Sequence, residues 1–244
     1  MRRSWAILVL AFCGALVMVH PAAATTWTPP PIGPGGRVLP GGPGDMVAAP
    51  QSRSVNGHRQ TTVTSSNWAG YAATSTTAQY TSVSASWVQP AASCSRGNQY
   101  GAFWVGLDGY ASPTVEQAGS EADCIGRTAE YSAWYEIYPS YPVYFASTVR
   151  PGDNLTASVS YTGANVFTLV ISDPTEHWTH TISATLAGAA RSSAEVIAEA
   201  PCCTYSGGTL PLTNFGTLNF TGATVNGAAL STTSPVEVVM PNAA

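Results

Sequence analysis

The stretch GAFWVGLDGYASPTVEQAG, residues 101–119, decides the fold. Alternation over its first half predicts a β-strand with two different faces. One face carries Phe103, Val105 and Leu107, and the other carries Trp104 and Asp108. Asp-Gly then indicates a turn, and a second strand follows, with Val115 and Gln117 on one face and Glu116 and Ala118 on the other. Because tryptophan, aspartate and glutamine stand where a plain core has leucine and valine, one sheet face is predicted to be a working surface.

Further short alternating segments follow one another from residue 61 on. They predict strands at 82–89, 131–138, 155–161, 165–172, 178–186, 194–199, 215–220 and 236–240. Segments 165–172 and 178–186 are expected to pair. Many short strands of this kind indicate an all-β sandwich or barrel. Since few of them are continuously apolar, antiparallel sheets with one wet face are expected.

The ends of the chain differ from this pattern. Residues 1–24 predict a secretory signal peptide, with Arg2 and Arg3 before an apolar segment and a small-residue cleavage site at 22–24. A membrane anchor is the alternative, but the apolar run is short for a span. Residues 25–60 are rich in Pro and Gly and predict an extended or disordered propeptide or linker. Residues 61–244 form the predicted β-sandwich domain of a secreted, extracellular protein, with no membrane contact after signal cleavage.

Charge is sparse and uneven. Only 9% of the 244 residues are charged, none is lysine, and the formal net charge is −4. From residue 61 on, 12 acidic residues face 4 arginines, which gives about −8. This balance excludes nucleic-acid binding. It suits an acidic medium, where carboxylates lose charge and their mutual repulsion falls.

Five cysteines are present, and Cys13 is removed with the signal peptide. Cys94, Cys124, Cys202 and Cys203 remain. An even number in a secreted chain indicates disulfides. Three pairings are possible, of which we favour Cys94–Cys124 with Cys202–Cys203.

Carboxylates are the best candidates for chemistry. After residue 61 the only histidines are His177 and His180, and no GxSxG nucleophile motif occurs. Alternation places His180 on the inner face, so packing is expected rather than catalysis or metal binding. Glu195 and Glu199 share one face of a strand, but their Cα atoms should lie about 13 Å apart. That is long for the carboxyl pair of a glycosidase, although either could pair with Glu136 or Glu116 on another strand.

Six segments in this order resemble the glutamic peptidases called eqolisins (peptidase family G1), which are secreted acid proteases. They are SSNWAGYAA (65–73), FWVGLDGY (103–110), VEQAG (115–119), YSAWYEIYP (131–139), RPGD (150–153) and AEVIAE (194–199). The resemblance implies that Gln117 and Glu199 form the catalytic dyad. It departs at Val196, where the family often has an aromatic residue, and at Ala118, where threonine is common.

The resemblance also implies an antiparallel β-sandwich of two large sheets, concanavalin/lectin-like, with one sheet curved into a substrate groove. It implies a monomeric, pepstatin-insensitive acid endopeptidase that acts on proteins or peptides and needs no cofactor or metal. In it, Glu199 takes a proton from water and later returns it to the leaving nitrogen, while Gln117 holds the water and stabilises the oxyanion. Gln117 is expected on the wet face. Expected supporting or substrate-binding residues are Trp68, Trp104, Asp108, Trp134, Glu136 and Glu195.

Two alternative functions follow from the residues alone. A β-sandwich glycoside hydrolase could use Glu136 together with Glu116 or Glu199, because tryptophan-lined grooves also bind sugars. A non-catalytic carbohydrate-binding module would leave Gln117 and Glu199 as surface polar residues. Neither alternative predicts the ordered set of six segments.

Overall fold

The computed structural model describes residues 46–55, 58–95, 97–201 and 209–240, with side chains from residue 61 on. The predicted signal peptide and the Cys202–Cys203 pair lie outside these ranges. Within them the chain is all-β, with one short 3₁₀ helix, η1 (Leu230–Thr233). The same ranges contain no helix long and apolar enough to cross a membrane.

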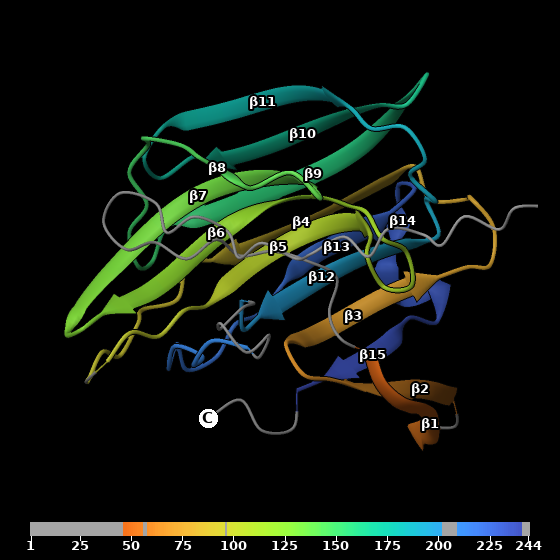
Figure 1. Cartoon of the computed structure of the whole chain (residues 1–244), viewed down its shortest axis with the longest axis horizontal. Coiled ribbons are helices and arrows are strands. Elements are labelled where there is room, and N and C mark those ends of the chain that lie inside the picture. The colour runs from red at the N-terminus through yellow and green to blue at the C-terminus, as the bar shows by residue number, and fades with distance from the viewer. Residues whose placement is uncertain (1–45, 56–57, 96, 202–208, 241–244) are drawn as a thin grey trace, which may run out of the picture.

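The strands form two sheets, as predicted (Figure 1). In spatial order, the nine-stranded sheet contains β1 (Met46–Val55), β2 (His58–Ser65), β15 (Val236–Val239), β3 (Trp68–Thr74), β12 (Ser193–Glu199), β5 (Ala102–Asp108), β6 (Val115–Ile125), β7 (Thr128–Tyr138) and β8 (Val143–Tyr144). The six-stranded sheet contains β11 (Trp178–Thr185), β10 (Val166–Asp173), β9 (Asn154–Gly163), β4 (Ser82–Val88), β13 (Thr221–Val225) and β14 (Ala228–Ala229). Neighbouring strands are antiparallel except β15 and β2, which pair in parallel.

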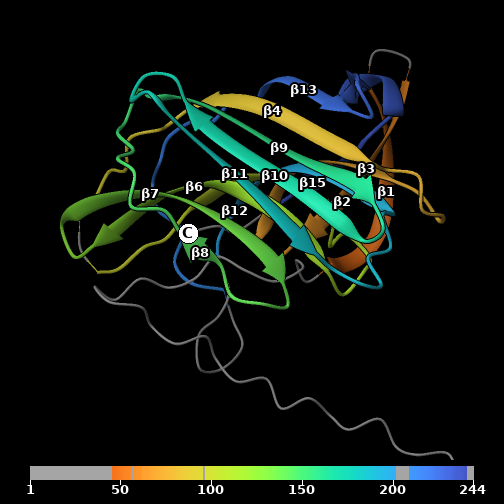
Figure 2. The same ribbon diagram turned by 90° about the horizontal axis from the view of Figure 1, so that it is seen from above.

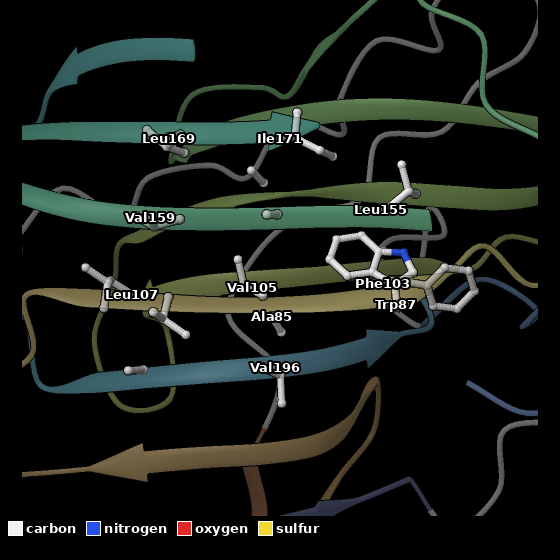
Figure 3. Packing of buried hydrophobic residues seen from close by; sticks show 14 of the residues in the cluster. Ala85, Trp87, Phe103, Val105, Leu107, Leu155, Val159, Leu169, Ile171 and Val196 are labelled. Carbon is white, nitrogen blue, oxygen red and sulfur yellow. The ribbon is translucent and has the colours of Figure 1, made fainter. Parts of the chain in front are cut away.

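The main core lies between the two sheets, which stack as layers (Figure 2). Phe103, Val105 and Leu107 of β5 point into it, as their alternation predicts. From the other sheet it receives Trp87, Leu155, Val159, Leu169 and Ile171 (Figure 3). Full burial of each such side chain stabilises the fold by about 1.5–3 kcal/mol.

A second apolar cluster lies on the opposite face of the nine-stranded sheet, which we call the outer face. Trp68, Trp104, Trp134 and Ile197 are its largest members, and all four are fully buried. Every residue of β5 is therefore buried, whichever way it points. The expectation of a wet face holds for the six-stranded sheet, where β11 alternates between half-buried and exposed residues. It is wrong for the centre of the nine-stranded sheet, because tryptophan rings pack over it.

Most predicted strands are confirmed, including the pairing of β10 with β11. The strand predicted at 215–220 is wrong. This segment has no ladder partner, and Gly216, at φ +69°, interrupts its extended conformation. Its apolar residues still contribute to the core, since Phe215 packs edge-on against Phe103 and Phe220 against Trp87.

One disulfide, Cys94–Cys124, occurs within the described residues, as predicted. It ties the segment before β5 to the end of β6, across 30 residues of sequence. Closing a loop of this length in the unfolded chain corresponds to roughly 3–4 kcal/mol in the chain-entropy description. We expect the Cys94→Ser, Cys124→Ser double variant to lose about that much unfolding free energy in urea. An unchanged urea midpoint would contradict this assignment.

Candidate active site

The register of five neighbouring strands, β3, β12, β5, β6 and β7, brings the candidate residues onto the outer face. Glu199 of β12 lies opposite Trp68 of β3 on one side and Ala102 of β5 on the other. Gln117 of β6 lies opposite Gly106 of β5 and Glu136 of β7. Between these two rows runs a third, which contains Ile197, Trp104, Gly119 and Trp134. Residues far apart in sequence therefore meet around the Trp104 indole.

Two glycines make room for that indole. A Cβ at Gly106 would lie 2.8 Å from the Trp104 ring, which shows that the ring lies across this residue. A Cβ at Gly119 would lie 2.2 Å from the carbonyl oxygen of Phe103 and 2.6 Å from the Cβ of Trp104. Side chains at these positions would push Trp104 off the sheet. Its other edge packs against Trp68, with ring centroids 4.9 Å apart.

Glu199 is fully buried and is held by two donors. Trp104 Nε1 donates to its Oε2 at 2.9 Å, and Asn67 Nδ2 donates to its Oε1 at 3.2 Å. Burial raises the pKa of Glu199 to about 8, and the bonds from Trp104 and Asn67 oppose that rise. The Trp68 indole also lowers this pKa, although its N–H makes no hydrogen bond of acceptable geometry within the described residues.

Gln117 is bonded to Glu136 on the neighbouring strand. Its Nε2 donates to Glu136 Oε2 at 2.5 Å, and both side chains are buried. Burial and then the nearby charge of Glu199 raise the pKa of Glu136 well above its usual value, against the Gln117 bond. Glu136 and Glu199 lie on the same face of the sheet, on β7 and β12, with β5 and β6 between them.

Several polar atoms on this face have no hydrogen-bond partner among the described residues. They are Gln117 Oε1, Trp68 Nε1 and Trp134 Nε1. Leaving a buried donor or acceptor unpaired costs about 1–3 kcal/mol, so such atoms are unusual in a structural core. An acceptor and two donors without partners, on the face that carries Glu199, suit a bound water or a peptide group.

The structure corrects the expectation that Gln117 lies on a wet face. Its side chain is 1% exposed, and that of Glu199 is 0% exposed. Trp68, Trp104 and Trp134 lie on the same face and are also fully buried.

Two of the predicted supporting residues lie away from Glu199. Asp108, at φ +69°, turns its carboxylate to the backbone N–H groups of Arg191 and Ser192, and so anchors the start of β12. Glu195 is separated from Glu199 by Ile197. The charges that raise its pKa, after burial, are those of Asp108 and Glu116. The others, Trp68, Trp104, Trp134 and Glu136, lie together on the outer face.

Glu116 lies on the face opposite Gln117. It pairs in register with Ile137, whereas Gln117 pairs with Glu136. A catalytic pair of Glu116 with Glu136 is therefore ruled out, because the two side chains point to opposite sides of the sheet. A pair of Glu136 with Glu199 shares one face.

Asn67 is the site residue that the sequence reasoning missed. It lies just before β3, is 3% exposed, and donates directly to Glu199. The resemblance of its segment, SSNWAGYAA, to the family implies no role for the asparagine. Its position next to Trp68, within a segment that resembles the family, is the signal that could have identified it.

Comparisons with known proteins agree with this geometry. A model of the Peptidase A4 family matches residues 66–239. No curated protein sequence matches the chain. A crystal structure of scytalido-glutamic peptidase with a peptide-based transition state analog is 26% identical, with a TM-score of 0.58, and the match covers 68% of this chain and 84% of that one.

Two further solved structures, at 24% identity, share the fold. Scytalido-glutamic peptidase with a transition state analog inhibitor has a TM-score of 0.61 over 70% of this chain and 86% of that one. SCP-B, an eqolisin in complex with the tripeptide Ala-Ile-His, has a TM-score of 0.55 over 68% and 84%. From the match to most of its length, this chain belongs to the Peptidase A4 family, the glutamic peptidases of the eqolisin type.

Proposed function

We propose that this protein is a secreted endopeptidase active in acid, in which Glu199 is the general base and acid and Gln117 binds the water and the oxyanion. The observation that carries the proposal is the outer face itself, where a buried, doubly bonded Glu199 lies with Gln117 and its unpartnered Oε1. Peptide substrates are supported by the relatives, which hold a peptide-based transition state analog and a tripeptide.

The hydrogen-bonding capacity of Gln117 suits both of its proposed roles. One of its two amide protons goes to Glu136, which fixes the amide orientation. Oε1 then accepts a hydrogen bond from the attacking water, and the second proton remains for the oxyanion. Glu199 takes the other proton of the water as its oxygen attacks the scissile carbonyl. The same carboxyl returns that proton to the leaving nitrogen, so it acts first as base and then as acid.

The protonation state of Glu199 depends on how far water reaches the site. In the buried site its pKa is about 8, so it holds its proton in acid and is no base. The proposal requires the outer face of the free enzyme to open to water, which would remove the burial that is the largest cause of that rise. The hydrogen bonds from Trp104 and Asn67 remain and favour the ionised form. An open site therefore ionises at acid pH, as an acid peptidase requires.

The glycoside hydrolase alternative retains only the pair of Glu136 with Glu199. One member of that pair, Glu136, accepts a hydrogen bond from the Gln117 amide, which in our proposal also binds the attacking water. Family membership favours peptide hydrolysis over sugar hydrolysis. Release of reducing sugars from soluble glucans, without proteolysis, would reverse this choice.

The Gln117→Ala variant tests the proposed oxyanion role. We expect kcat to fall about 10²–10³-fold, since that is the usual effect of removing one oxyanion donor, while KM changes little. The measurement is steady-state cleavage of a quenched fluorescent peptide at acid pH. A Gln89→Ala variant, which loses a buried amide bonded to Ser120 and to the Glu121 carbonyl, serves as the control for general destabilisation. Equal kcat values for wild type and Gln117→Ala would remove Gln117 from the mechanism.

A further inference from the structure

We propose that Asn67 is a positioning residue that keeps Glu199 ionisable in acid, and that Ser65 locks the Asn67 amide in the orientation this requires. The inference rests on the proposed function of Glu199 as general base.

The hydrogen bonds around Ser65 determine which way the Asn67 amide points. Ser65 Oγ accepts from the backbone N–H of Asn67 at 3.3 Å and from that of Trp68 at 3.1 Å. With both acceptor positions occupied, its single proton goes to Asn67 Oδ1, 3.1 Å away. The Oδ1 atom of Asn67 thus faces Ser65, and Nδ2 must face Glu199 Oε1. The flipped amide would break both contacts.

The backbone holds this arrangement beside the end of β12. Ala200, the residue after Glu199, donates its N–H to the Asn67 carbonyl oxygen at 2.8 Å. Asn67 thus binds β12 through its main chain and Glu199 through its side chain. Ser65 and Asn67 are both buried, so water does not compete well for these bonds.

The charged groups around Glu199 make this donor important. Glu136 approaches from β7, Glu121 lies in the same transverse row on β6, and Glu195 shares the face of β12. All three are acidic. The charge of Glu136 interacts with that of Glu199, whereas Ile197 separates Glu195 from Glu199 along the strand. Among the described residues, the groups that favour a negative charge on Glu199 are the neutral donors Trp104, Asn67 and Trp68. Removing one donor shifts the balance towards the protonated carboxyl, which cannot act as a base.

The test compares the pH dependence of kcat/KM for the wild type with Asn67→Ala, Asn67→Asp and Ser65→Ala. The acid limb reports ionisation of the base in the free enzyme. For Asn67→Ala we expect it to move to higher pH by about one unit, the usual weight of a hydrogen bond to a charged group. Asn67→Asp should move the acid limb further than Asn67→Ala does, because a carboxyl replaces the donor. Ser65→Ala should move the limb less than Asn67→Ala does. The kcat on the plateau and KM should change less than about threefold.

A control and a second readout separate positioning from stability. Gln89→Ala should lower the melting temperature without moving the acid limb. Infrared difference titration against Glu199→Gln, in each background, follows the Glu199 carboxyl without any substrate. If Asn67→Ala does not fold, the nearly isosteric Asn67→Asp and the conservative Ser65→Ala carry the same comparison.

An acid limb and a Glu199 titration identical to wild type in the folded variants would overturn the inference. An inactive wild type would instead refute the proposed function, and the infrared titration would still decide the role of Asn67. The inference would be established if the acid limb shifts most in Asn67→Asp, less in Asn67→Ala and least in Ser65→Ala, while the acid limb of Gln89→Ala stays at the wild-type pH.

Discussion

The Glu199→Gln variant is expected to lose peptide hydrolysis, with kcat reduced about 10³–10⁴-fold. Glutamine keeps the shape of the side chain, but its single oxygen can replace only one of the two carboxylate oxygens that accept from Trp104 Nε1 and Asn67 Nδ2. It cannot take a proton from water, and general acid–base catalysis typically contributes up to about 10⁴-fold. The measurement is cleavage of a fluorescent peptide by purified protein, with circular dichroism to show that the variant is folded.

Glu195→Gln is the matched control. Glu195 lies on the same strand and the same face, is equally buried, and receives the same substitution. Burial and then the charges of Asp108 and Glu116 raise the pKa of its carboxyl, which accepts a weak bond from Ser193. Its loss should therefore leave kcat within about threefold of wild type. Equal activity losses in the two variants would mean that Glu199 has no special place in the reaction.

The folded protein is expected to lose stability as the pH rises from acid towards neutrality. Glu116 is buried and neither carboxyl oxygen has a hydrogen-bond partner within the described residues. Burial, and then the charge of Asp108, raises its pKa from 4.5 to about 8, although the nearby Thr114 hydroxyl, which makes no full hydrogen bond to it, lowers this pKa somewhat. Because the folded pKa is above the unfolded one, its contribution is fully present below pH 4.5 and is lost progressively up to about pH 8. Glu116 alone should cost about 3 kcal/mol of unfolding free energy at pH 7 relative to pH 4.

Glu116→Gln tests this prediction, because an amide stays neutral at every pH. We expect the variant to match wild type at pH 4 and to be more stable by about 3 kcal/mol at pH 7, as measured by urea unfolding. Glu176→Gln, which changes a surface carboxylate paired with Arg150, should show no such gain at pH 7. A difference between wild type and Glu116→Gln that does not depend on pH would contradict the burial argument.

The sequence predicted which residues share a face because a strand has a strict period of two. That rule alone places Gln117 and Glu116 on opposite faces of the sheet, and likewise Phe103 and Trp104. Both placements are confirmed. The rule fails where the chain leaves the period. Asp108 has a positive φ and turns away from the groove it was expected to line, and Gly216 interrupts the segment predicted as a strand.

Burial of the site could not be predicted from local pattern. It depends on the Trp104 ring lying across Gly106 and packing against Trp68. Those contacts join three strands whose order in the sheet is set by long-range pairing. The same limit applies to Asn67, which is 132 residues from Glu199 in sequence. Alternation predicts the face of the sheet on which a side chain lies, but not the register between strands. By alternation alone, Glu195 and Glu199 are therefore equivalent candidates for the catalytic carboxyl.

Proteolysis across pH is the most direct test of the central claim, that the outer face holds the dyad of an acid endopeptidase. Purified secreted protein would be incubated with a denatured protein substrate from pH 2 to 8, with pepstatin present to inhibit aspartic peptidases. The account predicts cleavage confined to acid and unaffected by pepstatin. No cleavage at any pH by protein that is folded at acid pH would contradict it.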